Sequence, residues 1–222
     1  MASDSPPPAG PVDGLILAGG QSRRMRTPDA VDADKGLREW QGRPLVEQVA
    51  RYLREQGIGR IHISANRHPD DYARHGNVVA DPPDLHDCGP LAGVLAGLRQ
   101  TQSPWLFILP VDVVRWPEGL LARLCAAATP SRPAYARTAD GPHPLCLVVH
   151  RRMLPGLEDF LRSGQRQVQA WLRACEARAV DFPGADCLVN LNTPEDWLRW
   201  ASAPAAGPGA AGTAPGAGAR RA

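Results

Sequence analysis

A glycine-rich segment after an apolar run is the first place where this sequence could do chemistry. The segment is Leu17-Ala18-Gly19-Gly20-Gln21-Ser22-Arg23-Arg24-Met25, and Lys35 follows on the same connection. Consecutive glycines let backbone N–H groups converge on one point and let a ligand approach closely, which builds an anion-binding nest. Arg23, Arg24 and Lys35 add positive charge, so the pattern indicates a triphosphate site. A glycine turn beside two solvated arginines is the alternative. The segment matches neither G-x-x-x-x-G-K-[ST] nor G-x-G-x-x-G, the loops typical of kinase-like and dinucleotide sites.

Asp112 is the second candidate, because it closes the most hydrophobic run of the chain, 105–111. A carboxylate there could hold a magnesium ion that bridges the phosphates of a nucleotide. An aspartate in a loop more often caps a turn, so that alternative stays open. Asp81, which precedes Pro82 and Pro83, allows the same two interpretations, a ligand-binding residue or the cap of a turn.

Two further motifs allow both functional and structural interpretations. The run Gly89-Pro90-Leu91-Ala92-Gly93 places small residues at a helix start, where a base or sugar could lie against the backbone. Tight packing of helix on sheet would need the same glycines. His143 lies between Pro142 and Pro144 in a predicted loop, and we interpret it as structural. No serine–histidine–aspartate or cysteine–histidine arrangement has supporting context.

Alternating strands and helices must position these residues. Apolar runs predict strands, and helical spacing of apolar residues predicts helices. The expected strands cover 12–17, 60–65, 77–80 and 105–111, and the expected helices cover 44–56, 89–99 and 118–127. This alternation predicts one three-layer α/β/α domain with a mainly parallel sheet. Ligands in such sheets bind beyond the carboxyl ends of the strands, where the polar residues named above fall.

The composition argues against several classes of protein. The net charge of +2 and the scattered basic residues give no strong field for nucleic acid. No apolar run approaches the roughly 20 residues of a membrane span, and we expect neither a secretory signal nor a membrane association. Five cysteines without a C-x-x-C pair argue against a disulfide framework and a structural zinc site. We therefore expect buried thiols and a cytoplasmic location.

Both ends of the chain are rich in proline, glycine and alanine. Such segments bury too little apolar surface to offset the entropy lost on ordering. We expect disorder over 1–11 and 202–222, and a folded domain over 12–201.

Taken together, the motifs closely resemble those of the molybdenum cofactor guanylyltransferases. Several stretches carry the resemblance and occur in the family's order: LILAGGQSRRM (15–25), DKGL (34–37), GRPLVEQVARYL (42–53), ISANRH (63–68), VVAD (78–81), GPLAGVLAGL (89–98), LPVD (109–112), HP (143–144) and VNLNTPEDW (189–197). They cover nearly all of the expected folded part. LAGG alone would indicate only the wider nucleotidyltransferase superfamily.

The resemblance implies a Rossmann-like nucleotidyltransferase fold that binds GTP and magnesium and acts on molybdopterin or the molybdenum cofactor. It implies charge stabilisation by Lys35 and Arg23, and Asp112 as the magnesium ligand. Asn190, Asn192 and Thr193 would lie on the pterin side. Other cofactor-biosynthesis proteins and the target apoenzymes are the further partners implied. The nucleotide site would comprise Leu17, Ala18, Gly19, Gly20, Ser22, Lys35, Ser64, Asn66, Asp81, Gly89, Pro90, Leu91 and Asp112.

The chain departs from the family pattern at three places. Residues 26–33 form a longer link before Asp34 and Lys35, Ser64 stands where some members carry asparagine, and Val111 replaces a cysteine. We expect the longer link to close over bound phosphates as a lid. Two rival functions remain: a related transferase acting with CTP or on a sugar phosphate, and a non-catalytic GTP-binding adaptor that delivers cofactor.

Overall fold

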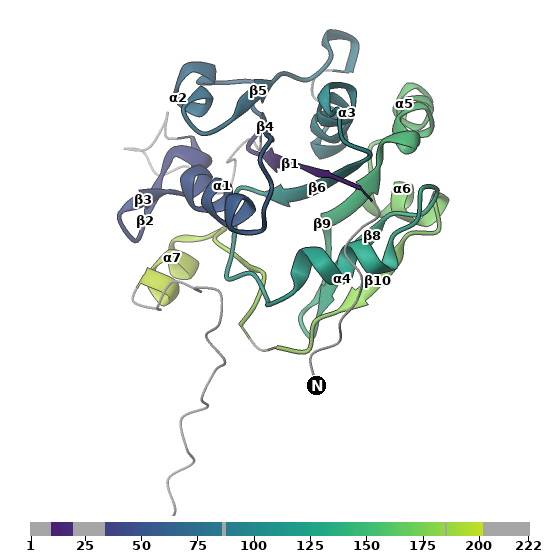
Figure 1. Ribbon diagram of the computed structural model, residues 1–222. Coiled ribbons are helices and arrows are strands. Elements are labelled where there is room, and N and C mark those ends of the chain that lie inside the picture. Colours follow the sequence, from purple (N-terminus) through teal and green to yellow (C-terminus); the bar gives the residue numbers. More distant parts are fainter. Residues whose placement is uncertain (1–9, 20–33, 86–87, 185, 202–222) are drawn as a thin grey trace, which may run out of the picture.

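The computed structural model describes residues 10–19, 34–85, 88–184 and 186–201. Its centre is a seven-stranded sheet in the order β10-β8-β9-β6-β1-β4-β5 (Figure 1). Strand β9 runs antiparallel to both of its neighbours, and the other four pairs are parallel. The expected mainly parallel sheet is confirmed. The strands are β1 (Val12–Leu17), β4 (Ile61–Ser64), β5 (Asn77–Val79), β6 (Trp105–Pro110), β8 (Ala134–Thr138), β9 (Gly141–His150) and β10 (Arg178–Asp181).

Helices cover both faces of the sheet, which gives the three layers. One face packs against α1 (Leu45–Glu55), α2 (Pro69–Ala73) and α4 (Leu120–Ala127). The other packs against α3 (Pro90–Gln100), α5 (Leu154–Arg162) and α6 (Val168–Ala174). The last helix, α7 (Pro194–Ala201), lies outside these layers, toward the β2–β3 hairpin (Glu39–Trp40 and Arg43–Pro44) in Figure 1. None of the described helices is long and apolar enough to cross a membrane.

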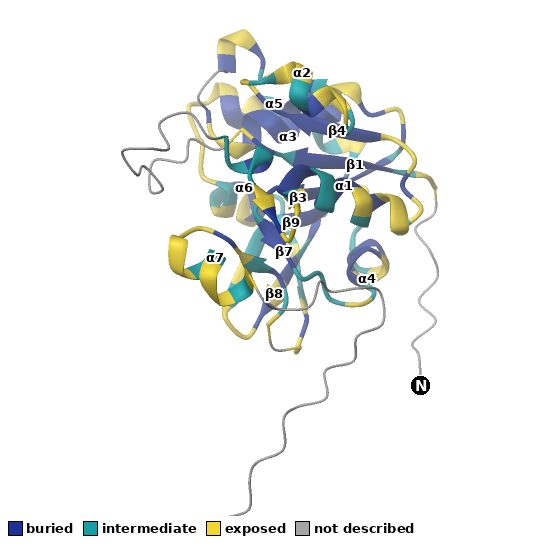
Figure 2. Ribbon diagram, turned by 90° about the vertical axis from the view of Figure 1, so that its left-hand side faces the viewer, coloured by how far each residue is buried: buried dark blue, intermediate teal, exposed yellow. Residues whose placement is uncertain are grey.

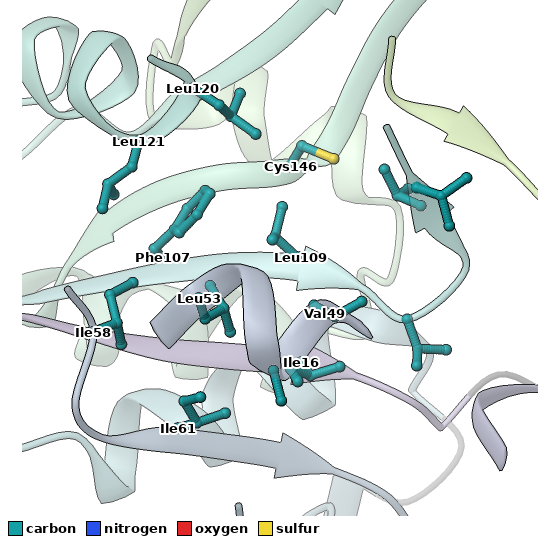
Figure 3. Packing of buried hydrophobic residues seen from close by; sticks show 14 of the residues in the cluster. Ile16, Val49, Leu53, Ile58, Ile61, Phe107, Leu109, Leu120, Leu121 and Cys146 are labelled. Carbon is teal, nitrogen blue, oxygen red and sulfur yellow. The ribbon is translucent and has the colours of Figure 1, made fainter. Parts of the chain in front are cut away.

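Strand β6 shows how one apolar run serves two cores. Successive side chains of a strand point to opposite faces of the sheet. Phe107 and Leu109 accordingly join the cluster under α1 and α4, as Figure 3 shows, whereas Leu106 and Ile108 join the cluster under α3 and α5. A strand buried on both faces must be apolar throughout, and this explains why the run was the clearest strand in the sequence.

The chain crosses from one half of the sheet to the other beside β1. From β1 it passes through α1 to β4 and then to β5, both on one side. It then passes through α3 to β6 on the opposite side of β1. Such a switch opens a crevice at the carboxyl ends of the strands. Strands β1, β4, β5 and β6 all end at that edge.

One expectation is wrong. Residues 141–144 form the start of β9 and not a loop, and His143 accepts or donates a hydrogen bond with Thr138 Oγ1 at 3.0 Å. Prolines are tolerated there because that stretch pairs only with β8, whereas β6 pairs with β9 from Leu147 onward.

A buried carboxylate lies at the opposite, amino-terminal edge of the sheet. Asp13 is 4% exposed, and its oxygens accept hydrogen bonds from the hydroxyls of Thr101 and Ser103, each at 2.7 Å. The backbone N–H groups of Gln102 and Ser103 donate to it as well. Burial alone would raise the pKa of Asp13, but these hydrogen bonds hold it below its ordinary value. The cluster ties β1 to the segment that enters β6.

The cysteines and the chain ends complete the comparison with the sequence. Cys88, Cys125 and Cys146 are buried, Cys175 and Cys187 are half-buried, and none of these five is in a disulfide. Most of 1–11, all of 202–222 and the proposed lid over 26–33 lie outside the described residues.

Candidate active site

A cavity of about 570 Å³ opens at the carboxyl edge of the sheet, at the switch beside β1. The end of β1 forms its floor and is held from both sides. Ala18 N–H donates to Ser64 O at 2.9 Å, and Val111 N–H donates to Leu17 O at 3.0 Å. The cavity is therefore built on the rigid centre of the sheet.

The segment that carries Lys35 is fixed by its neighbour in sequence. Asp34 caps the short helix η1 (Lys35–Leu37), because its carboxylate accepts a hydrogen bond from Gly36 N–H at 3.1 Å. The buried hydroxyl of Tyr72 donates to the same carboxylate. Gly36 fits against Tyr72, where a Cβ would collide with the phenol. The Asp34-Lys35 pair is thus a structural unit: the aspartate anchors the turn and the lysine projects from it.

Lys35 reaches two side chains that are distant in sequence. Its Nζ lies 2.6 Å from Asp112 Oδ2 and 2.6 Å from Asn192 Oδ1. The lysine side chain is 14% exposed and that of Asp112 is 23% exposed. A pair that is neither sealed from water nor fully solvated can exchange partners when a charged ligand arrives.

The segment after Asp112 is joined to the end of the described chain. Strand β7 (Val113–Val114) pairs antiparallel with β11 (Val189–Asn190), and Leu191 N–H donates to Asp112 O at 3.0 Å. This pairing brings Asn192 beside Asp112 and Lys35. Asn190 lies in β11 opposite Val113.

The other end of the cavity carries a second carboxylate, braced by an amide. Asn66 Nδ2 donates to Asp81 Oδ2 at 2.8 Å, and Asp81 N–H donates to Asn66 Oδ1 at 3.0 Å. These two bonds fix Asp81 against the loop after β4. A carboxylate held in this way can accept hydrogen bonds from the N–H groups of a ligand.

The start of α3 forms the wall between the two ends. Gly89 caps the helix with φ of 74°, a left-handed conformation that favours glycine. Gly93 lies against Ser64 and Leu17, and a Cβ there would collide with Ser64 Oγ. The glycines allow tight packing on the sheet, and Gly89, Pro90 and Gly93 also line the cavity.

Most of the residues proposed from the sequence meet in this one cavity, but some do not. Leu91 is fully buried in the core, and Asn190, Asn192 and Thr193 are not among the residues that line the cavity. Gly20, Ser22 and Arg23 lie outside the described residues. The sequence-proposed residues that line the cavity are Leu17, Ala18, Gly19, Lys35, Ser64, Asn66, Asp81, Gly89, Pro90 and Asp112.

Sequence reasoning did not propose Pro110, Val111 and Leu145 as site residues, but they also line the cavity, as does Gly93 from the predicted helix start. Leu145 comes from β9, and only the pairing of β9 with β6 could have placed it there. A second hollow of about 610 Å³ lies between β8, β9 and α6 and includes Tyr135, Arg173 and Glu176. It holds none of the residues proposed for phosphate or metal binding, so we place the candidate site in the first cavity.

Comparison with known proteins shows which family this chain belongs to. A family model described as a MobA-like NTP transferase domain matches residues 14–180. A molybdenum cofactor guanylyltransferase of Serratia proteamaculans is 38% identical over 192 residues, which cover 85% of this chain and 93% of that protein.

Two solved structures share the fold. Molybdopterin-guanine dinucleotide biosynthesis protein A from Archaeoglobus fulgidus has a TM-score of 0.62 at 20% identity, covering 85% of this chain and 96% of that one. The inositol-1-phosphate CTP transferase from T. maritima has a TM-score of 0.68 at 14% identity, covering 85% and 92%. On the family match and the sequence identity, this chain belongs to the MobA-like NTP transferase family and is a nucleotidyltransferase.

Proposed function

We propose that the chain transfers a GMP group from GTP to the terminal phosphate of molybdopterin, with release of pyrophosphate. The observation that carries this proposal is the contact of Lys35 with Asp112 at one end of the 570 Å³ cavity. The volume falls within the roughly 300–1,000 Å³ typical of small-molecule sites. A cation and an anionic metal ligand side by side suit a substrate that brings both phosphates and a divalent ion.

The residues present fit magnesium. Mg²⁺ is commonly bound by one or two carboxylates together with substrate phosphates and waters. Within the described residues, no group of three or more histidine, cysteine, aspartate or glutamate side chains could form a metal cage. Asp112, beside Lys35 at the end assigned to the phosphates, is the carboxylate that would hold the ion, and the phosphates of GTP would complete the coordination. Bound there, magnesium would neutralise charge that develops on the phosphates.

The chain's own residues would act by alignment and charge stabilisation. An oxygen of the acceptor phosphate forms a bond to the α-phosphorus of GTP, and the bond from that phosphorus to the bridging oxygen of the β-phosphate breaks. The acceptor oxygen is already ionised at neutral pH, so no general base is needed. Lys35 would hold the phosphates in line, with Arg23 as a second cation. Asn192, beside Lys35, would face the acceptor side.

Guanine selectivity is supported by the opposite end of the cavity and by the relatives' names. The braced carboxylate of Asp81 can accept hydrogen bonds from the N–H donors of guanine. The relative from Serratia proteamaculans is named as a guanylyltransferase. We assign the nucleotide base to the end formed by Asn66 and Asp81, and the phosphates to the end formed by Lys35 and Asp112.

The location and further partners follow from this activity. A reaction between GTP and a soluble phosphorylated pterin belongs in the cytoplasm. The product would pass to the apoenzymes that use it, with other molybdenum-cofactor proteins supplying the acceptor. The adaptor alternative is weaker because delivery alone needs no lysine–aspartate pair at the phosphate end.

Titration calorimetry with nucleotides tests the nucleotide half of this proposal. We expect GTP with magnesium to bind about tenfold more tightly than CTP, because CTP leaves hydrogen-bonding groups at Asp81 unmatched. Chelating the magnesium should weaken GTP binding. CTP binding as tightly as GTP would instead assign the chain to the cytidylyl branch of the fold.

A further inference from the structure

The position of the Lys35 ammonium is set by groups outside its own turn. A lysine carries its charge on a flexible four-carbon stem, so its partners decide where the charge lies. Asp112 is one partner and Asn192 Oδ1 is the other, both at 2.6 Å. Because Asp112 would also hold the metal, Asn192 is the partner that stays available to Lys35 when the metal is bound.

Asn192 is in turn held by one carboxylate of α7. Asp196 Oδ2 accepts hydrogen bonds from Asn192 N–H at 3.0 Å and from Thr193 N–H at 2.8 Å. Thr193 Oγ1 accepts the bond from Asp196 N–H at 3.2 Å. This reciprocal arrangement is a capping box. It differs from a simple cap because Asp196 also binds the residue before the cap, whose side chain contacts Lys35.

Helix α7 packs against the core through Trp197 and Trp200, and the same two side chains meet arginines beside the active site. The guanidinium of Arg38, which directly follows the Lys35 turn, lies 4.5 Å from the ring centroid of Trp197. That of Arg115, just after β7, lies 5.0 Å from the ring centroid of Trp200. The rest of the helix is exposed or half-buried, as Figure 2 shows. These two cation–π contacts of α7 thus lie beside the two segments that carry Lys35 and Asp112.

We propose that Asp196 is a positioning residue that acts through Asn192 to hold the Lys35 ammonium toward the phosphates of the bound nucleotide. The inference rests on the phosphate role proposed for Lys35. Asp196 itself need not touch nucleotide or acceptor. Its carboxylate fixes the backbone of Asn192, the Asn192 amide oxygen fixes Lys35, and Lys35 meets the phosphates.

The test is the affinity of the full-length chain for GTP with magnesium, measured by titration calorimetry without an acceptor. We expect Asp196→Ala to weaken GTP binding about fivefold. That factor corresponds to the free energy of helix stability that loss of an N-terminal cap removes in other proteins. Asp196→Asn should recover most of the affinity, because its amide oxygen can still accept from both N–H groups.

Leu198→Gly is the matched control for simple fraying of the helix. Leu198 is 77% exposed in the middle of α7, so glycine there weakens the helix without removing a core contact. Circular dichroism melts of both variants should show similar small losses of stability. Only Asp196→Ala should weaken GTP binding.

A double-mutant cycle with Lys35→Met tests whether Asp196 acts through the lysine. In the Lys35→Met background, Asp196→Ala should change the affinity less than about twofold, because no ammonium is left to position. An equal effect in both backgrounds, no effect of Asp196→Ala, or an equal effect of Leu198→Gly would overturn the inference while GTP binding by the parent chain still stood. Absence of GTP binding by the parent chain would overturn the proposed function, and this inference with it.

Discussion

A hydrogen-bonded aspartate lies at the amino-terminal ends of the strands and another at their carboxyl ends. The two aspartates differ in the groups to which they are hydrogen-bonded. Asp13, at the amino-terminal edge, is 4% exposed and bonded to two hydroxyls and two backbone N–H groups. Asp112, at the carboxyl edge, has a side chain that is 23% exposed and is paired with the ammonium of Lys35.

The difference separates stability from function. The hydrogen-bond partners of Asp13 are short side chains and backbone N–H groups of residues 101–103, which the fold itself fixes, so its charge is satisfied once the chain has folded. The partner of Asp112 is the ammonium of Lys35, which the proposed function assigns to the phosphates of the nucleotide. A carboxylate saturated by the fold supports the fold, and one paired with an exchangeable cation is available to a metal and a substrate. The same substitution at the two sites should therefore have opposite consequences.

The largest effect should follow from Asp112→Asn. The substitution keeps the size of the side chain and removes the charge that would hold magnesium. By analogy with the loss of one preorganised electrostatic group, we expect turnover to fall at least ~10²-fold. The melting temperature should stay close to that of the parent because the site is half-exposed. Measurement of pyrophosphate release checks the first part, and an unchanged rate would show that Asp112 only caps a turn.

Asp13→Asn should show the reverse pattern. The amide cannot replace the charge that four donors surround, and hydrogen bonds to charged groups contribute about 1.5–3 kcal/mol. We expect the free energy of unfolding to fall by about 2 kcal/mol in urea titrations. The affinity of the folded variant for GTP with magnesium should not change. A clear loss of GTP affinity, measured without denaturant where the variant is fully folded, would contradict this separation of roles between Asp13 and Asp112.

A smaller effect should come from His62, which lies beside Asp13. Its Nε2 is 3.7 Å from Asp13 Oδ2, its Nδ1 is 3.1 Å from Asn77 Nδ2, and the residue is 2% exposed. Burial lowers the pKa of His62 below the ordinary 6.5, against the opposing effect of Asp13.

The sign of the pH effect follows from this lowering. The unfolded chain takes up a proton near pH 6.5 that the folded chain does not, so stability should decrease as the pH falls below about 6.5. His62→Gln removes that titration. Thermal melts between pH 7 and 5 should therefore decline less in the variant than in the parent. Equal declines would show that His62 is protonated freely in the folded protein.

The sequence alone predicts the strands and helices whose own residue pattern decides their structure. Strand β6 and most of β1 bury apolar side chains on both faces, and α1 buries Leu45, Val49 and Leu53 at helical spacing, so the sequence predicts each of them. Strand β9 was not, because its prolines indicate a turn and only its pairing with β8 explains why they are tolerated. Tertiary context overrode local propensity there.

The candidate site likewise has a part that the sequence predicts and a part that depends on tertiary contacts. Glycines and polar residues that directly follow strands could be placed at one edge, because parallel strands end together. The contact between Lys35 and Asn192 joins residues 157 positions apart and depends on the pairing of β7 with β11. No local pattern reports such a contact. The capping box of Asp196 could have been read from Thr193 and its spacing, but its link to Lys35 could not.

Turnover by the purified chain tests the central claim most directly. GTP, magnesium and molybdopterin are incubated with the protein, pyrophosphate is measured, and the pterin product is identified by mass spectrometry. We predict one pyrophosphate released for each guanine dinucleotide formed, no release when molybdopterin is omitted, and little product when CTP replaces GTP. Pyrophosphate release that does not depend on molybdopterin, or a product that carries cytidine, would contradict guanylyl transfer to the pterin.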